Sequence, residues 1–196
     1  ILKMTGIDKR FSGVHALNNV DFELRSGEVH ALMGENGAGK STLMKVLCGI
    51  HSRDAGEIEY FGKPVNFSNI AESQAAGISI IHQELNMMNH LTVAQNIYIG
   101  REPKKAGVYI DDRKMEQDAR NLFKRIGIHI NPSVKLGTLT VGKQQMVEIA
   151  KAISHDSKLL ILDEPTAALT QPEVEELFRI MNDLRDKGIG MIYISH

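Results

Sequence analysis

A glycine-rich segment at residues 34–41 carries the clearest chemical signal in the sequence. It reads Gly-Glu-Asn-Gly-Ala-Gly-Lys-Ser, with an apolar strand-like run at residues 28–33 before it and a helical stretch at residues 42–47 after it. That spacing in that context is typical of a phosphate-binding loop. Its glycines let successive backbone N–H groups point at phosphate oxygens, and the helix N-terminus adds the positive end of its dipole. We predict that this segment, here called the phosphate loop, binds a nucleotide.

Two side chains of the phosphate loop have predicted roles of their own. Lys40 is expected to reach the β- and γ-phosphates, and the Ser41 hydroxyl to bind Mg²⁺. A glycine-rich turn that matches by chance is the alternative, and it arises in on the order of one in a hundred chains of this size. The residues predicted to contact the nucleotide here are Gly34, Glu35, Asn36, Gly37, Ala38, Gly39, Lys40, Ser41 and Thr42.

A second candidate for a functional site is the acidic strand end at residues 158–164, where an apolar strand ends in Asp163 and Glu164. Open α/β sheets place ligand chemistry at the carboxyl ends of their parallel strands. We predict that Asp163 holds Mg²⁺ through water and that Glu164 is the general base that orients the attacking water. Many strands end in solvated acids, so the signal comes from the pairing of this segment with the phosphate loop.

The elements that must position these residues alternate between short apolar runs and helix-period segments, which predicts an α/β fold. Near-continuous apolar runs indicate parallel strands buried on both faces. Between residues 81 and 158 the helical pattern dominates, including residues 112–126, which indicates a helical insertion. The expected strands are residues 19–24, 28–33, 78–81, 158–162 and 189–194.

Two apolar stripes predict helices near the C-terminal end of the chain. One stripe starts near Met146, and the other follows Thr170. Thr170 and Glu173 have the spacing of a capping box, with Pro172 at an early helical position and Gly188 as the stop signal.

Composition excludes several classes of protein. The chain has 196 residues, 42% of them hydrophobic, a formal net charge of -1 and a single cysteine, Cys48. No apolar run approaches the roughly 18 residues that span a bilayer. A balanced charge argues against nucleic acid as a partner, and one thiol fits a reducing compartment. Because the chain begins at Ile1 with no initiator methionine and no basic-then-apolar leader, we expect a short stretch to be missing from the front and the chain to be a fragment.

With the phosphate loop and the acidic strand end in place, the chain resembles an ABC-type ATPase over its whole length. Further segments occur in the order of that family. The resemblance implies that Gln83 contacts magnesium and the attacking water, that His196 touches the γ-phosphate, and that Phe11 stacks on adenine. Taken singly, the glutamine could be a turn residue, the histidine a solvated strand end and the phenylalanine a core or rim aromatic.

Residues 139–145 occupy the position of the family's signature segment. The resemblance implies that this segment caps the γ-phosphate bound to a partner's phosphate loop, again with a helix N-terminus. The segment departs from the common Leu-Ser-Gly-Gly-Gln, because threonine, valine and lysine replace its serine, first glycine and glutamine; Thr170 likewise replaces a usual aspartate. The residues concerned are Thr140, Val141, Gly142, Lys143 and Gln144.

The segments around the phosphate loop and the acidic strand end are similar to the ATP-binding subunits of bacterial monosaccharide importers. In those subunits two ATPase halves are fused in one polypeptide, and this chain resembles the first half. The implied fold is a P-loop NTPase (RecA-like) core with an ABC-type antiparallel β subdomain and an inserted α-helical subdomain. Residues 1–88 and 156–196 are expected to form the core and β subdomain. Residues 89–155 are expected to form the helical subdomain with the signature segment.

The resemblance implies an ATPase, with ATP and Mg²⁺, that powers sugar import from the cytoplasmic face of the bacterial inner membrane. Implied partners are a second ATPase half or a second copy, transmembrane permease subunits and, indirectly, a periplasmic sugar-binding protein. Residues 91–100 either pack against the permease or form an ordinary amphipathic helix inside the insert. The competing functions are a soluble ABC ATPase acting on ribosomes or DNA, and a nucleotide-binding regulator without hydrolysis, against which Glu164 counts.

Overall fold

The computed structural model describes residues 1–81, 87–105 and 107–195. The chain folds into two compact units. The first consists of Ile1–Ile80, Ser157–Glu164 and Arg185–His196, and the second of Ile81–Asp156 and Pro165–Leu184. The segment expected to be helical, residues 89–155, falls within the second unit, which also takes in the chain that follows Glu164.

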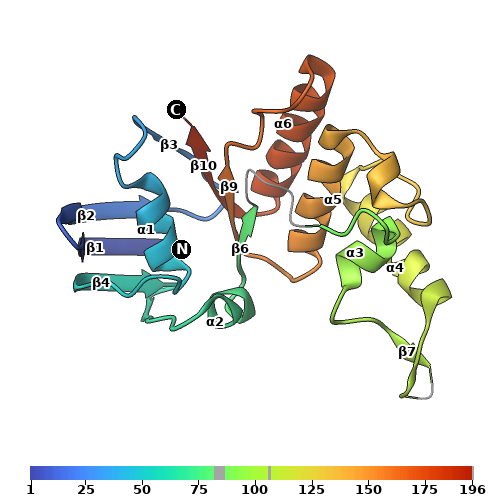
Figure 1. The fold of residues 1–196 in the computed structure, drawn as a ribbon, viewed down its shortest axis with the longest axis horizontal. Helices are drawn as coiled ribbons and strands as arrows, with labels where there is room; N and C mark the ends of the chain where they lie inside the picture. Colours follow the sequence, from blue (N-terminus) through green and yellow to red (C-terminus); the bar gives the residue numbers. More distant parts are fainter. Residues whose placement is uncertain (82–86, 106, 196) are drawn as a thin grey trace. The chain divides into compact units, whose positions relative to one another are not determined.

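An antiparallel sheet forms one layer of the first unit (Figure 1). Its strands run in the order β2-β1-β4-β5, and β1 pairs antiparallel with both β2 and β4. Side chains at Leu2, Met4 and Ile7 of β1 are buried, while the pairing register shifts between Met4 and Ile7. The strands are β1 (Leu2–Phe11), β2 (Val14–Leu24), β4 (Ala55–Tyr60) and β5 (Lys63–Pro64).

A second sheet in the order β3-β10-β9-β6 carries the acidic strand end. Its central strand β10 pairs in parallel with β3 on one side and with β9 on the other. All four apolar residues of β9 are buried, as the sequence predicted for a strand covered on both faces. The strands are β3 (Val29–Met33), β6 (Ile78–Ile81), β9 (Leu159–Asp163) and β10 (Gly190–Ser195).

One hydrophobic core joins both sheets of the first unit. Helix α1 (Lys40–Leu47) contributes Leu43, Met44 and Leu47 to a cluster that also contains apolar side chains of β1, β2, β4, β6, β9 and β10. Figure 1 shows α1 beside the strands of the antiparallel sheet. A short helix, α2 (Ile70–Ala75), completes the unit. The helix that follows the phosphate loop is therefore anchored through its apolar side.

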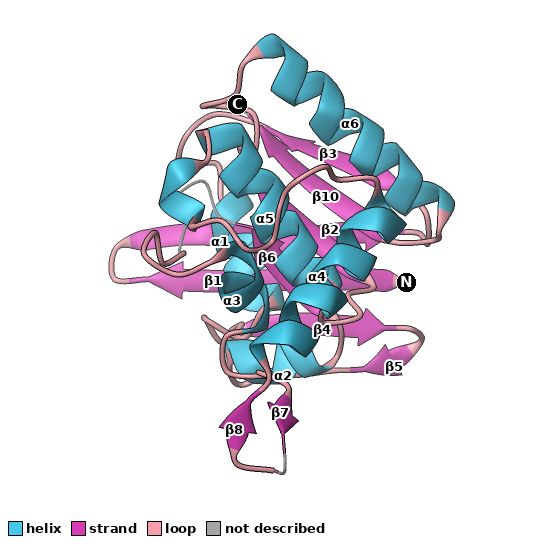
Figure 2. Ribbon diagram, turned by 90° about the vertical axis from the view of Figure 1, so that its right-hand side faces the viewer, coloured by secondary structure: helices cyan, strands magenta, loops and turns pink. Residues whose placement is uncertain are grey.

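The second unit is helical, as expected from the sequence (Figure 2). Helix α4 begins and ends at the predicted residues, and a small hairpin, β7 with β8, precedes it. Most of α6 also belongs to this unit. The elements are α3 (Val93–Tyr98), β7 (Lys104–Lys105), β8 (Tyr109–Ile110), α4 (Asp112–Ile126), a 3-10 turn (Leu136–Thr138), α5 (Val141–Ile153) and α6 (Gln171–Asp186).

Helix α3 covers part of the segment for which two interpretations stood open. Val93, Ala94 and Ile97 are fully buried, and the helix packs on α4 and α5 within the second unit. Its start is fixed by a capping box between Thr92 and Gln95. The apolar face of α3 therefore serves the interior of the helical unit. Among the helices of residues 1–81, 87–105 and 107–195, none has the length and apolar character needed to cross a membrane.

Candidate functional site

The carboxyl ends of three parallel strands lie in one row. Strand pairing aligns Leu32 of β3 with Ile194 of β10, and Ile194 with Asp163 of β9. One step further, the backbone N–H of Glu164 donates to the carbonyl oxygen of Ile194 at 3.1 Å. The phosphate loop leaves β3 at this edge and Glu164 leaves β9 at the same edge. The sheet therefore brings the phosphate loop and the acidic strand end to the same edge, with β10 between them.

The backbone of the phosphate loop depends on glycine at its last turn. Gly39 has φ of 89°, a left-handed conformation, and a Cβ placed there would lie 2.6 Å from the carbonyl oxygen of Ala16. Gly39 is also the N-cap of α1, and the first hydrogen bond of this helix is donated by the Leu43 N–H to the Gly39 carbonyl oxygen at 2.9 Å. Because glycine has no side chain, it provides no cap for the N–H groups of the first turn. These groups are oriented to receive an anion.

Lys40 holds its charge inside the phosphate loop. Its ammonium donates to the backbone oxygens of Gly34 and Glu35, the second at 3.0 Å, and the residue is only 9% exposed. A buried ammonium is costly unless it is hydrogen-bonded, and here the carbonyls of the loop meet that need. The lysine is thus positioned within the loop, where phosphate oxygens can replace those carbonyls as stronger, charged acceptors.

Oxygen ligands suited to magnesium lie in both the phosphate loop and the acidic strand end. The Ser41 hydroxyl is exposed in the first turn of α1, and Asp163 is half-buried at the end of β9. Among the described residues, no group of three or more histidine, cysteine or acidic side chains could hold a metal by itself. Magnesium is usually held by one or two protein oxygens together with phosphates and water. The donors present fit that kind of site.

Glu164 lies in a strained backbone conformation directly after β9. Its φ is 46°, in the left-handed region that non-glycine residues rarely adopt. Such residues cost on the order of 1 kcal/mol or more and cluster at functional sites. The turn leaves the carboxylate at the strand end while the N–H stays bonded to β10.

Phe11 ends β1 with 41% of its surface exposed. The ring of His51 meets it edge to face, with centroids 5.1 Å apart, and the Lys9 ammonium lies 5.5 Å from its centroid. The contact with His51, which lies 40 residues away, was not predicted from the sequence. An exposed aromatic ring is suited to stack on a flat ligand, which is the role predicted for Phe11.

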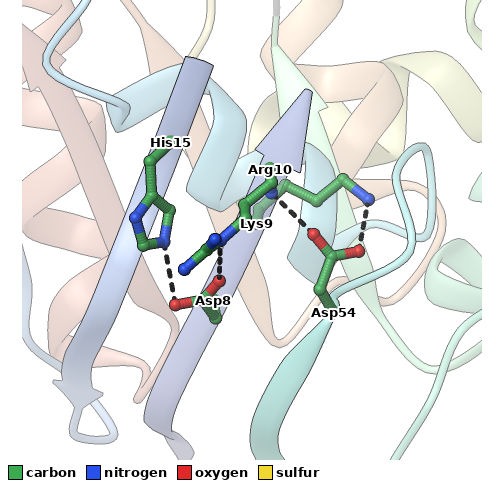
Figure 3. Close-up of polar contacts among 5 residues, drawn as sticks. All are labelled: Asp8, Lys9, Arg10, His15 and Asp54. Atoms are coloured by element: carbon green, nitrogen blue, oxygen red, sulfur yellow. Dashed lines mark hydrogen bonds and ion pairs between the residues drawn. The ribbon is translucent and has the colours of Figure 1, made fainter. Parts of the chain in front are cut away.

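A network of charged groups fixes the strand end that carries Phe11 (Figure 3). Asp54 accepts hydrogen bonds from the Arg10 backbone N–H at 2.6 Å and from the Lys9 ammonium at 3.0 Å. Asp8 pairs with His15 at 2.9 Å and with Arg10 at 3.6 Å. The Arg10 N–H, followed by Lys9, holds the pKa of Asp54 below its ordinary value. Asp54 is a supporting residue that the sequence analysis missed.

The signature segment lies at the start of a helix, as predicted. Thr140 is the N-cap of α5 and accepts a hydrogen bond from the Lys143 N–H, while the Gln144 side chain donates to the Leu139 carbonyl at 3.1 Å. Val141 is 47% exposed, and Gly142 is buried. The valine that replaces the family's first glycine therefore projects outward from the first turn.

The predicted residues divide into three groups. The phosphate loop, Asp163, Glu164 and Phe11 lie in the first unit, and residues 140–144 lie in the second. Gln83 and His196 lie outside the described residues.

The chain is similar in sequence to known proteins over its whole length. A family model described as ABC transporter matches residues 17–167. Over its whole length the chain is 60% identical to ribose/galactose/methyl galactoside import ATP-binding protein 2 of Burkholderia cenocepacia (strain HI2424), of which it covers 38%. It is 53% identical to a similarly named protein of Albidiferax ferrireducens, of which it covers 39%. The chain thus spans less than two fifths of the length of these relatives.

The fold matches solved structures as well. An ATP-binding cassette of an ABC transporter in its ADP conformation superposes with a TM-score of 0.87 and 27% identity, over 100% of this chain and 81% of that one. The predicted fold class, a P-loop NTPase core with an antiparallel β subdomain and a helical subdomain, is confirmed.

The geometry at Gly39 predicts unequal costs for two alanine substitutions. Gly37 and Gly39 both have positive φ, but a Cβ at Gly37 meets no atom within 4 Å, whereas one at Gly39 meets the Ala16 carbonyl. Gly37→Ala is expected to cost about 1 kcal/mol of unfolding free energy, and Gly39→Ala at least about 2 kcal/mol. Urea unfolding of both variants measures the difference, and equal costs would contradict the close approach.

The Asp54 network predicts a pH-dependent contribution to stability. Because its pKa is lowered by folding, the contribution of Asp54 is fully present above the ordinary value of 3.8 and is lost as the pH falls through the folded-state pKa. The Asp54→Asn variant lacks this contribution to the free energy of unfolding at every pH. Urea unfolding between pH 7 and pH 3 is expected to show a stability gap between wild type and variant that narrows below about pH 4. A gap that stays constant would rule out this linkage.

Proposed function

The chain belongs to the ABC transporter family, and we propose from that premise that it binds and hydrolyses ATP to power the import of a monosaccharide across the bacterial inner membrane. The observation that carries the ATPase part is the shared sheet edge, which joins the phosphate loop to Glu164 through β10. The sugar part is supported by the names of relatives that are 53% and 60% identical. Because those relatives are much longer, the transport activity belongs to a larger polypeptide or complex.

Each predicted site residue outside the signature segment has a defined task in hydrolysis. The ammonium of Lys40 exchanges its backbone acceptors for β- and γ-phosphate oxygens, and the N–H groups at the start of α1 bind the same phosphates. Ser41 and Asp163 hold Mg²⁺, which supplies charge neutralisation at the phosphates. Glu164 orients the attacking water and accepts its proton. Gln83 and His196 are proposed to contact the water and the γ-phosphate, and Phe11 to stack on adenine.

A second ATPase half completes the site in this proposal. Residues 140–144 of each half cap the γ-phosphate bound by the other, so ATP stabilises a closed pair and hydrolysis removes that contact. The second half is either part of the same polypeptide or another copy. The closing and opening of the two halves drives transmembrane permease subunits at the cytoplasmic face of the membrane. A periplasmic sugar-binding protein is an indirect partner of the ATPase.

The competing functions lack comparable support. An ABC ATPase that acts on ribosomes or DNA is not favoured, because the relatives carry import names and the net charge is -1. A regulator without hydrolysis is opposed by Glu164, the acid that the reaction requires.

Steady-state ATP hydrolysis by the intact polypeptide in its membrane complex tests the proposal. We expect one sugar-loaded binding protein to stimulate hydrolysis. ATP hydrolysis that no monosaccharide stimulates, but that ribosomes or DNA stimulate, would contradict the proposal and support the competing function.

Lys40→Ala is expected to weaken ATP binding between roughly tenfold and a hundredfold, because it removes a charge-assisted contact. A binding titration with Mg-ATP measures the effect. Lys45→Ala is the matched control, since Lys45 is exposed on the same helix and carries the same charge. Equal affinities of the two variants would reject the assigned role of Lys40.

Glu164→Gln is expected to bind ATP within about threefold of wild type and to lose turnover by at least about a hundredfold, because the amide retains the shape but not the basicity of the carboxylate. Binding and single-turnover hydrolysis are measured on the same preparation. Hydrolysis at the wild-type rate would show that another group is the base.

A further inference from the structure

One carboxylate lies at the start of two helices in the second unit. Glu173 accepts a hydrogen bond from the Thr140 hydroxyl at 2.7 Å, and Thr140 is the N-cap of α5. It also accepts from the backbone N–H of Thr170 at 3.0 Å and from the Thr170 hydroxyl at 2.9 Å, just before α6. The acid that the sequence marked as a cap for α6 therefore also engages the signature segment of α5.

Glu173 also lies directly against the first turn of α5. A Cβ placed on Gly142 would lie 2.1 Å from the carboxyl carbon of Glu173 and 2.4 Å from one of its oxygens. A side chain at position 142 would therefore have to displace the Glu173 carboxylate. The glycine that the signature segment keeps thus makes room for a carboxylate of the same chain.

The surroundings stabilise the charged form of this carboxylate. Its pKa is lowered by the Thr170 N–H, then by the Thr140 hydroxyl, with a smaller contribution from the charge of Lys143. The N-terminus of α5 adds the positive end of a 13-residue helix. A negative group is therefore held where, by the proposed function, a phosphate must bind.

We propose that Glu173 is an internal competitor of the γ-phosphate: its carboxylate occupies the Thr140 hydroxyl and the first turn of α5 until ATP on the opposing half displaces it. The inference rests on the proposed function, in which residues 140–144 cap that phosphate.

The geometry explains how the competition works. The Thr140 hydroxyl has one proton to donate, so it cannot serve both anions, and the two negative groups repel each other. The carboxylate keeps both bonds to Thr170 as it leaves Thr140, so displacement does not strand its charge. Glu173 thereby raises the ATP concentration needed to close the two halves.

The test measures closure in the intact polypeptide with Glu164→Gln as the parent, so that ATP is bound but not hydrolysed. Energy transfer between reporters on the two ATPase halves is followed as a function of Mg-ATP concentration. Adding Glu173→Gln is expected to lower the half-maximal concentration about fivefold, because the amide keeps an acceptor oxygen but loses the charge. Glu175→Gln, an exposed position on the same helix that bonds Gln171, is the matched control and is expected to change nothing.

A merely structural role predicts the opposite direction. If Glu173 only joins the two helices, Glu173→Gln leaves the half-maximal ATP concentration unchanged or raises it, and either result overturns the inference. A parent that does not close at any ATP concentration overturns the proposed function and the inference together. A parent that closes while Glu173→Gln shows no decrease overturns the inference alone.

Glu173→Asp gives a second, independent check if Glu173→Gln does not fold. It keeps the charge but is one methylene shorter, so the carboxylate withdraws from Thr140. Its half-maximal ATP concentration is expected to fall about twofold. A value at or above that of the parent overturns the inference.

Discussion

The parallel pairing of β10 with β3 and β9 is the constraint on which the rest of the site depends. It puts Leu32, Ile194 and Asp163 in one row, so that the phosphate loop and Glu164 leave the sheet at the same edge. A slip of one residue in β9 would move Asp163 by about 3.3 Å and turn its side chain to the other face. Such a slip is unfavourable because it would move a charged residue, Lys158 or Asp163, into a position that buries Leu159 or Leu162.

The site is held ready by hydrogen bonds that a ligand can replace. Lys40 is bonded to carbonyl oxygens of its own loop, and Asp54 fixes the strand end that carries Phe11. Such preorganisation lowers the cost of binding, because the groups that must be ordered are ordered already. In the second unit Glu173 has the opposite effect: it occupies the Thr140 hydroxyl at the start of α5 and, in the proposed competition, raises the ATP concentration that closure needs.

Local patterns in the sequence predicted the phosphate loop, the acids at the end of β9, and helices such as α4. These features depend on spacing within a few residues. Strand β1 went unpredicted because its alternation is broken where the register shifts between Met4 and Ile7. The contacts of Phe11 with His51 and of Glu173 with Thr140 join residues 40 and 33 positions apart, and only the tertiary fold brings such pairs together.

The most direct test of the account is a structure of the intact ATPase with Mg²⁺ and a slowly hydrolysed ATP analogue. The account predicts that the Lys40 ammonium leaves the Gly34 carbonyl for the β- and γ-phosphates, with the metal on Ser41 and the Glu164 carboxylate facing the γ-phosphate. A nucleotide bound away from the phosphate loop, or phosphates out of reach of Lys40, would contradict it.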